Sequence, residues 1–555
     1  MAISNMAEPP NTYTFEHPVL GSMIGLVPPE TPDIVRFRAI PYATIPGRFQ
    51  HSIPLDNLDT HSRIFTQPGH ACPHSFSVYD DQSGGPYPGE APIKTSEYDC
   101  LILEINVPKS HLEGSKSDKL PVLTYIHGGG FFLGKIDAQH NTAYMAQHSR
   151  TIGKPVITTA LQYRFGALGF LATPDGGKNF ALRDQQNALL WVQKFVIGFG
   201  GDARKVTVFG ESAGAVSICC HMLSHVPSSG PLFQRVVLMS GVLGPMMTPQ
   251  PVANATKNFS DFCTSLGITD TGIAALENLR ALPVEKIVAA SEAFLHPGII
   301  WPPVQDPSFF RYQDITWDTS PILLGQCEWI SHIIIGTTGF EGAANRPVIN
   351  KLTPATFLAQ LKTSLSDDAA EKVMRAYDIQ VGMDQNRFVT KAMRWCGNLI
   401  FDAPIHATIN HLTTHTSKCV YRYIFDIRNP YPNAPFYQQA HHWVDVYFVF
   451  RALQFRYPYE YLKDLSDTHA ELWIRFACGE EPWSRYNASG NEVDGERVIM
   501  VADEREGWVE KTMREYEEMS KVEWKVLDEL WEAWEEKKGA EWFPLNMVSL
   551  KHLSS

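Results

Sequence analysis

The stretch that decides the fold is FGGDARKVTVFGESAG, residues 199–214. Its centre, Lys205 to Phe209, is a short β-branched run next to a glycine, which is typical of a buried strand. The next residues, GESAG, match the pattern G-x-S-x-G, and Ala213 to Leu223 is apolar and long enough to be a helix. The sequence therefore predicts a strand, a sharp turn and a helix, with Ser212 at the turn.

Such a turn would expose the hydroxyl of Ser212. It needs Gly210 and Gly214, because a Cβ at either position would collide with the neighbouring strand or helix. The start of the helix offers unpaired N–H groups and a partial positive charge to an oxyanion. The pattern G-x-S-x-G alone occurs often by chance, but its place between a strand and a helix favours a nucleophilic serine.

The composition is that of an ordinary soluble globular protein, with 44% hydrophobic and 19% charged residues. A length of 555 residues would by itself favour three or four domains. We expect a single catalytic domain over residues 1–555 instead, because one set of motifs spans most of the chain. The net charge of −13 argues against nucleic acid or an anionic membrane as a partner.

The first twenty residues show no basic segment followed by an apolar one, so no signal peptide is evident. No apolar run reaches the roughly 18 residues that indicate a transmembrane segment. We therefore expect a cytoplasmic protein, either a monomer or a homodimer.

Continuous apolar runs alternate with helical patterns along the chain. A run of this kind is typical of a strand that is covered on both faces of a parallel sheet. Asp184 to Phe199 has apolar residues at helical spacing and ends in two glycines. The fold class predicted is α/β with a central, mostly parallel sheet. The strands expected besides 205–209 are Tyr98–Pro108, Leu120–Ile126, Pro155–Tyr163, Gln234–Ser240 and Ile330–Gly336.

Three further stretches have helical patterns. Residues 251–292 and 353–409 are interpreted as helical insertions at the edge of the sheet, rather than as separate domains. Residues 508–538 are interpreted as a C-terminal helical tail, in which Val526, Leu530 and Trp534 repeat every four residues. Packing of this tail on the main body is favoured over a role in dimerisation.

A nucleophilic serine needs a neutral imidazole as base, a carboxylate that orients the imidazole, and N–H donors for the oxyanion. The predicted strand 120–126 leads into His127 and three successive glycines, whose backbone can approach a substrate closely. The alternative is a flexible glycine turn, but its place after a strand favours an oxyanion hole. Ala213, directly after the serine, offers a further N–H group.

Candidates for the acid and the base follow later in the chain. Glu341 lies in the loop GTTGFEG after a predicted strand, although a solvent-exposed loop glutamate would have the same spacing. His441 and His442 are adjacent, so at most one of them can face Ser212. As a pair they could instead bind a metal, but no Cys, Asp or Glu with ligand spacing accompanies them. The order serine, acid, histidine is that of an α/β-hydrolase.

The motifs resemble those of a known family. FGGDARKVTVFGESAG resembles the serine-site signature of the type-B carboxylesterase and cholinesterase-like lipase family, and YDCLILEINVP resembles its second signature. HGGGF, LQYRFGALGFL and LRDQQNALLWVQKFVIGFGGD fit the same family. The resemblance runs from about Thr14 to Phe450. It implies an α/β-hydrolase fold with large helical insertions and the hydrolysis of carboxylic esters.

The resemblance also implies roles for single residues. The family's base lies three residues before an acidic residue, here Asp445, which selects His442 over His441. Ser240 matches a serine that hydrogen-bonds near the acid, and Glu341 matches the acid itself. The nucleophile and the oxyanion-hole donors correspond to Ser212, Gly129, Gly130 and Ala213.

Two departures concern the pocket, which we expect to be apolar. Trp443 follows the histidine where many members have glycine, and Phe340 precedes Glu341 where aspartate is common. Cys72 and Cys100 match a family disulfide, although the expected reducing compartment argues against its formation. Candidate pocket residues are Phe131, Phe132, Trp301, Phe340 and Trp443.

The function predicted is a serine hydrolase that cleaves small, apolar carboxylic esters through an acyl-enzyme, with a Ser-His-Glu triad and with no cofactor or metal. One alternative is an acyltransferase or lactone-forming enzyme that uses the same acyl-enzyme. Another is a catalytically silent binding protein with the same fold, which the complete triad argues against.

Overall fold

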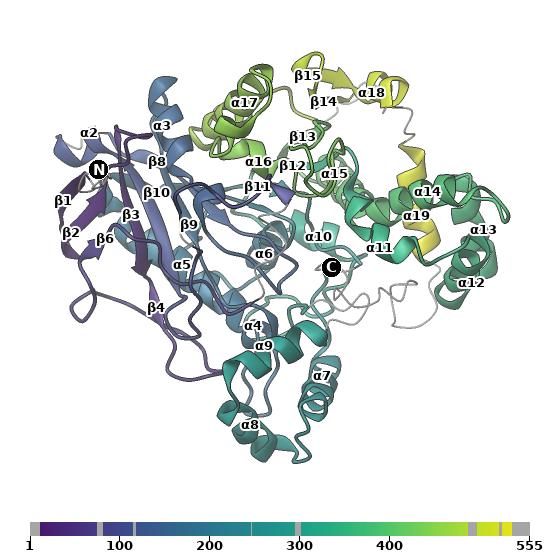
Figure 1. Ribbon diagram of the computed structural model, residues 1–555, viewed down its shortest axis with the longest axis horizontal. Coiled ribbons are helices and arrows are strands. Elements are labelled where there is room, and N and C mark those ends of the chain that lie inside the picture. The colour runs from purple at the N-terminus through teal and green to yellow at the C-terminus, as the bar shows by residue number, and fades with distance from the viewer. Residues whose placement is uncertain are drawn as a thin grey trace, which may run out of the picture.

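The computed structural model describes residues 11–74, 82–90, 92–114, 118–245, 247–294, 301–486, 497–520 and 524–535, without the side chain of residue 535. Within these ranges a thirteen-stranded sheet forms the centre of the molecule (Figure 1). A separate two-stranded sheet pairs β4 (Ala43–Thr44) with β5 (Ile53–Pro54).

The middle of the large sheet is parallel, as the sequence predicts, and both edges are antiparallel. The antiparallel first edge contains β1 (Thr12–His17), β2 (Gly21–Leu26), β3 (Ile34–Pro41) and β7 (Ile102–Pro108), with β6 (Ile64–Phe65) beside β2. The parallel strands follow in the order β9 (Ile157–Leu161), β8 (Leu120–Ile126), β10 (Gly201–Glu211), β11 (Arg235–Met239), β12 (His332–Thr338), β13 (Cys419–Phe425) and β14 (Val498–Asp503).

Alternate residues of the central strands belong to two different hydrophobic cores. Ile333 and Ile335 contribute to the larger core, whereas Ile334 contributes to the core on the other face. This alternation follows from the strand's period of two, and it explains why the whole run is apolar. Helices α5 (Phe180–Phe195), α6 (Ala213–Met222) and α15 (Ala403–His415) cover the first face, and α3 (Ala143–Thr151) and α17 (Tyr461–Ala477) cover the second.

Two groups of helices extend beyond the sheet, at the bottom and at the right of Figure 1. Residues 251–292 contain α7 (Val252–Ser265), α8 (Gly272–Ala281) and most of α9 (Val284–Ala293). Residues 353–409 contain α12 (Pro354–Ser364), α13 (Asp367–Ala376), α14 (Gln385–Gly397), the π-helix η4 (Asn398–Asp402) and the start of α15. Shorter helices are α2 (Lys109–Glu113), α4 (Gly166–Phe170), α10 (Ser320–Gly325), α11 (Arg346–Ile349) and α16 (Val446–Val449).

The C-terminal stretch differs from the prediction at its start. Residues 508–512 belong to the strand β15 (Gly507–Thr512), which pairs antiparallel with β14, so the helix expected there is wrong. The edge of the sheet offers unpaired backbone groups, and pairing with them outweighs the weak helical pattern of GWVEKT. Two helices follow, α18 (Met513–Ser520) and α19 (Lys525–Glu535), and residues 536–538 lie outside the described ranges.

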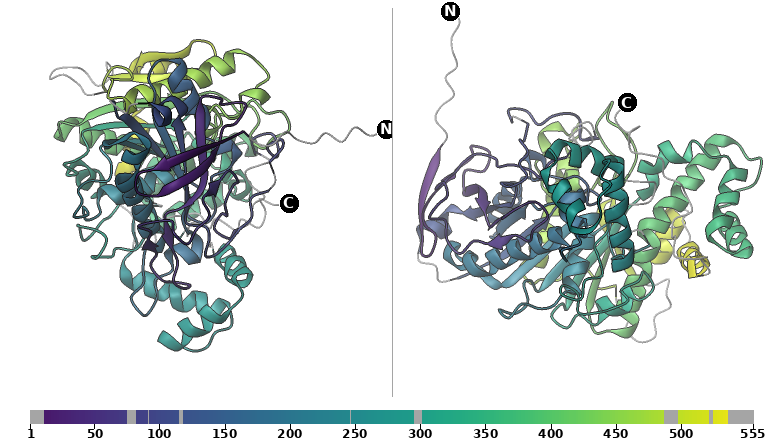
Figure 2. Two further views of the ribbon diagram at one scale, coloured as in Figure 1. Left: turned by 90° about the vertical axis from the view of Figure 1, so that its left-hand side faces the viewer. Right: turned by 90° about the horizontal axis from the view of Figure 1, so that it is seen from below.

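Helix α19 returns to the body of the molecule and packs against α13 and α15 (Figures 1 and 2). Leu530 and Trp534 are almost fully buried, as expected from their spacing. None of the helices in the described ranges combines the length and the apolar character needed to cross a membrane.

Candidate active site

Ser212 lies at the sharp turn between β10 and α6. Its φ of 54° and ψ of −121° fall in a region that costs a non-glycine residue about 1–3 kcal/mol. The backbone around it is tightly packed, because a Cβ on Gly214 would lie 2.1 Å from the carbonyl oxygen of Ile126 and one on Gly210 would lie 2.8 Å from it. The strand and helix therefore hold Ser212 in a strained turn that only two glycines permit.

The glycine loop after β8 lies next to this turn. Gly129 has a φ of 110°, and a Cβ there would lie 2.1 Å from the carbonyl oxygen of Leu133. Gly130 has a φ of 60°, and both glycines are half-buried. Within the described residues, the N–H groups of Gly129, Gly130 and Ala213 donate to no protein acceptor. These three groups are therefore free to donate to a ligand oxygen.

Glu341 begins the 3-10 helix η3 (Glu341–Asn345), directly after β12. The residue is buried, and its Oε1 accepts hydrogen bonds from Ser240 Oγ at 2.6 Å and from the Thr338 N–H at 2.7 Å. Its Oε2 lies 2.6 Å from Nδ1 of His442. Glu341 is thus a buried carboxylate with three hydrogen bonds rather than a solvent-exposed loop residue, and Ser240 contacts it directly.

The two adjacent histidines have different environments. His442 faces Glu341, whereas His441 packs between Phe436 and Tyr447, and its Nε2 lies 3.3 Å from Nδ2 of Asn429. Burial lowers the pKa of His441 to about 4, so this ring stays neutral at physiological pH. Only His442 is placed to exchange protons with a group at the elbow.

The second ring nitrogen of His442 lies beside the elbow. Its Nε2 is 3.1 Å from Oε1 of Glu211, the residue before the serine. No hydrogen bond between Ser212 Oγ and His442 occurs among the contacts of these described residues. Contacts of this type are often long in a substrate-free enzyme and shorten when substrate binds.

Two more buried carboxyl groups surround His442. Burial, together with the charges of Asp445 and Glu341, raises the pKa of Glu211 well above its ordinary value. Burial and the charge of Glu341 raise the pKa of Asp445 to about 7, and Asp445 accepts a hydrogen bond from Tyr423 at 3.1 Å. Of the three carboxyl groups, Glu341 has the most hydrogen bonds.

A profile of the carboxylesterase family matches residues 18–519. The chain belongs to the carboxylesterase family. It is therefore a carboxylic ester hydrolase, as the sequence predicts. Lipase 1 of Yarrowia lipolytica (strain CLIB 122 / E 150) is 28% identical over 456 residues, which cover 80% of this chain and 84% of the lipase. The para-nitrobenzyl esterase of Bacillus subtilis (strain 168) is 27% identical over 510 residues, covering 86% and 94%.

The fold agrees with this membership. A solved structure of a PNB esterase superposes with a TM-score of 0.70 and 24% identity, over 92% of this chain and all of that chain. A thermophilic PNB esterase superposes with a TM-score of 0.69. The α/β-hydrolase fold that the resemblance implied is thus confirmed.

Phe401 is a residue near the site that the sequence did not reveal. It lies in the π-helix η4, and its ring stacks on His442 with centroids 4.2 Å apart and planes 24° apart. Single π-helical turns within α-helices often occur at functional sites. Nothing in the helical pattern of residues 353–409 marks this ring, because the stacking depends on tertiary packing. The sequence analysis also missed the contact of Glu211 with His442, although the position of Glu211 directly before Ser212 indicates that it lies near the site.

Trp443, the first departure from the family pattern, packs beneath the glycine loop. Its ring is buried, and a Cβ on Gly128 would lie 2.9 Å from it. The edge of the ring meets His140, whose Nδ1 lies 2.8 Å from Oδ1 of Asp137. Burial opposes the charge on Asp137, but His140 and Lys135 keep the pKa of Asp137 well below its ordinary value. Trp443 therefore packs against the glycine loop at Gly128.

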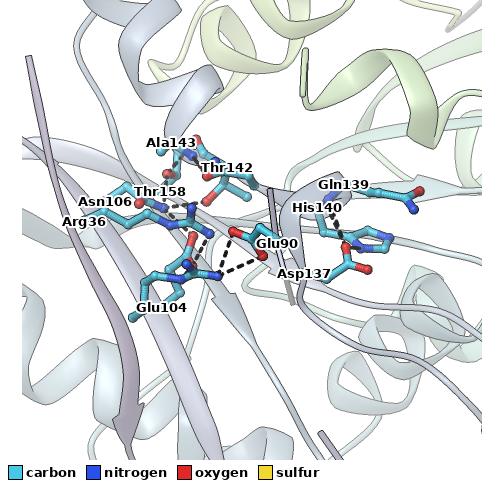
Figure 3. A network of polar contacts seen from close by, with 12 residues as sticks. Arg36, Glu90, Glu104, Asn106, Asp137, Gln139, His140, Thr142, Ala143 and Thr158 are labelled. Carbon is cyan, nitrogen blue, oxygen red and sulfur yellow. Dashed lines mark hydrogen bonds and ion pairs between the residues drawn. The ribbon is translucent and has the colours of Figure 1, made fainter. Parts of the chain in front are cut away.

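Figure 3 shows the polar network next to this support. Arg36 on β3 forms a buried ion pair with Glu104 on β7 at 2.7 Å. Asn106 donates to Glu104 and, at 2.8 Å, to Thr142, which precedes α3. Because each of these charges has a partner, the network fixes β3, β7 and the start of α3 beside the segment that contains Asp137 and His140.

The other pocket candidates differ in exposure. Phe131 is buried, and its ring centroid lies 4.7 Å from that of Phe170. Trp301 stacks on Phe294 with ring centroids 5.4 Å apart. Phe132 and Phe340 are only half-buried, so their rings are more accessible. Contact of these aromatic residues with a substrate stays a prediction.

The candidate disulfide between Cys72 and Cys100 stays a prediction. Cys72 and Cys100 are both buried, free cysteines. They are nevertheless neighbours, since hydrogen bonding with Cys72, followed by burial, raises the pKa of the Cys100 thiol well above its ordinary value. A protonated, buried thiol reacts slowly with oxidants.

Proposed function

We propose that this carboxylesterase cleaves its substrates through an acyl-enzyme formed on Ser212, with His442 as general base and Glu341 as the orienting acid. The observation that carries this proposal is the 2.6 Å contact between Glu341 Oε2 and His442 Nδ1 beside the elbow. A hydroxyl is a weak nucleophile at neutral pH, and a neutral imidazole oriented by a carboxylate is what activates it.

The reaction begins when the Ser212 oxygen attacks the ester carbonyl and its proton passes to Nε2 of His442. The carbonyl oxygen becomes an oxyanion, which the N–H groups of Gly129, Gly130 and Ala213 would bind. His442 then protonates the departing alcohol, which leaves the acyl group on Ser212. Water attacks this acyl group in the same way, with His442 again removing the proton.

The contact with Glu341 favours the charged imidazolium in this scheme. Glu341 lies against Nδ1, where it can stabilise the positive charge of His442. Burial raises the pKa values of Glu211 and Asp445, which favours their neutral forms over further counter-charges. The site thus offers His442 one fixed negative charge, and that charge lies on the side away from the serine.

The substrate class that we propose is a small, uncharged ester with apolar groups. The half-buried rings of Phe132 and Phe340 support an apolar pocket. Relatives named as lipases and as a para-nitrobenzyl esterase support an ester bond as the target.

The proposal is tested by the hydrolysis of para-nitrophenyl butyrate. Ser212→Ala is expected to lower kcat about 10⁶-fold, which is the size of loss seen when a triad serine is removed. Ser260→Ala, which removes an exposed hydroxyl on α7, is the matched control and should keep full activity. A Ser212→Ala protein that unfolds at the same temperature as the parent but hydrolyses at a comparable rate would refute the proposal.

A further inference from the structure

The loop of the catalytic acid is held by hydrogen bonds from several elements. The N–H of Gly339 donates to the carbonyl oxygen of Phe425 at 2.9 Å, and the N–H of Phe340 donates to that of Ala440 at 2.8 Å. The carbonyl oxygen of Gly339 accepts a hydrogen bond from Nη1 of Arg394 at 2.6 Å. Arg394 thus holds the backbone two residues before the catalytic acid.

Arg394 also contacts the next residue of this loop. Its guanidinium lies 4.5 Å from the centre of the Phe340 ring, a distance at which a cation is attracted to the face of an aromatic ring. The side chain is half-buried on α14, so part of it is shielded from competing water. One arginine therefore contacts both the backbone of Gly339 and the ring of Phe340, which are the two residues before Glu341.

Helix α14 is itself packed against the backbone of the acid loop. It lies beside α11, the helix that directly follows η3 (Figure 1). A Cβ on Gly342 would lie 1.8 Å from the carbonyl oxygen of Met393, and one on Gly397 would lie 2.4 Å from the N atom of Gly342. This packing fixes the helix to the residue after Glu341, while the Arg394 side chain reaches the residues before it. One helix thus holds the chain on both sides of the catalytic acid.

Two carboxyl groups interact with the charge of Arg394. Asp402 lies in η4, and Asp426 follows β13, where a Cβ on Gly339 would lie 1.9 Å from its Oδ1. Burial is the largest cause that raises the pKa of Asp402 to about 7 and that of Asp426 to about 6, and the charge of Arg394 opposes both shifts. Each carboxyl group attracts the guanidinium when it is ionised, so both add to the forces that keep Arg394 at the loop.

We infer that Arg394 is a positioning residue for the catalytic acid, an inference that rests on the proposed role of Glu341. The carboxylate must keep its 2.6 Å contact with Nδ1 of His442 to orient the imidazole, and a misplacement of about 1 Å can lower the rate about 10²-fold. Without the guanidinium, the loop keeps its two backbone N–H bonds but loses the contacts of Arg394 with Gly339 and Phe340. We therefore expect the fold to remain while the acid spends less time in its productive position.

Arg394→Met tests this role on the full chain, because methionine keeps an apolar stem on α14 and removes the guanidinium. With para-nitrophenyl butyrate we expect kcat to fall about tenfold and KM to stay within about twofold, since the groups proposed to bind the ester oxygen are unchanged. Arg387→Met is the matched control, because Arg387 is exposed earlier on the same helix, and its kcat should stay within about twofold of the parent value. Unchanged kcat in Arg394→Met, or a change in KM alone, would overturn the inference.

A double-mutant cycle shows whether Arg394 acts through the acid. Glu341→Gln alone should lower kcat about 10⁴-fold, which is the loss seen when the acid of a triad becomes an amide. If Arg394 acts by holding Glu341, adding Arg394→Met to this variant should lower kcat less than about twofold further. A further loss of about tenfold would show that Arg394 acts independently of the acid, and would overturn the inference. Parental kcat in Glu341→Gln would instead refute the proposed acid, so the two failures are distinguishable.

Discussion

The candidate active site is built from two regions that differ in how strongly the sequence determines them. The loops at the ends of β8, β10 and β12 contain the glycine loop, the elbow and Glu341. The helical region from α12 to α15 adds Phe401, whose ring stacks on His442. The loops depend on backbone contacts that tolerate only glycine at a few positions, whereas Phe401 depends on side-chain packing between distant segments.

The contrast shows why motifs predict one region and not the other. At Gly214 the obstacle is a backbone oxygen 2.1 Å from the missing Cβ, so the required residue type is fixed and visible in the sequence. At Phe401 the partner is a ring 41 positions along the chain, and any apolar residue would satisfy the local helical pattern. Substitutions in the two regions should therefore have different effects on stability and on kcat.

The largest effect is expected from a comparison of the two adjacent histidines. His442→Gln should lower kcat about 10³-fold or more, because the base is lost. His441→Gln keeps most of the side-chain volume of a ring that stays neutral, so it should retain at least about 100 times the activity of His442→Gln. The two variants are compared by their rates of hydrolysis of para-nitrophenyl butyrate. Equal losses in both variants would remove the distinction that the contact of His442 with Glu341 supports.

Gly214→Ala tests the backbone-determined region. The added Cβ meets the Ile126 oxygen, so elbow and strand must separate, and we expect a loss of stability of about 2–3 kcal/mol with a large drop in kcat. Gly153→Ala is the control, since its Cβ would meet nothing within 4 Å and only the positive φ of 71° is penalised. Urea unfolding measures both variants. A Gly214→Ala protein as stable as Gly153→Ala would show that the elbow is not sterically constrained.

Phe401→Leu tests the packing-determined region. The substitution keeps an apolar side chain but removes a stacked ring pair worth about 0.5–1.5 kcal/mol, so kcat should fall up to about tenfold. Phe401→Tyr should retain the stack and most of the activity, and Phe455→Leu, at an exposed ring, should have no effect. If Phe401→Leu changed KM alone, the ring would contact substrate rather than orient His442.

The last prediction concerns the pH dependence of stability. Folded Glu211 keeps its proton above the pH at which an unfolded glutamate, with its ordinary pKa of about 4.3, releases it. The folded state thus binds more protons, and the free energy of unfolding falls as pH rises from there toward the raised pKa. Glu211→Gln removes this fall, by up to about 1.4 kcal/mol per pH unit. Urea unfolding at pH 5, 6, 7 and 8 measures it, and parallel curves for parent and variant would contradict it.

Much of the architecture could be predicted from the sequence, because continuous apolar runs such as Ile333 to Ile335 require burial on both faces of a sheet. The strand at residues 508–512 could not be predicted, because it forms by pairing with β14. At the site, the family resemblance pointed to Glu341 and His442, but the orientation of Glu211 toward His442 depends on how β10 meets the loop before α16. Residues whose role comes from a distant partner leave no local pattern.

The central claim is that Ser212 becomes covalently acylated, and the most direct measurement is active-site titration followed by mass spectrometry. A para-nitrophenyl alkylphosphonate forms a stable adduct with an activated serine and releases one para-nitrophenolate per active site. We predict one adduct per chain, on the peptide that contains Ser212, with labelling much slower in His442→Gln. An adduct on another residue, or undiminished ester hydrolysis in a protein that takes up no label, would contradict the assignment of Ser212 as the nucleophile.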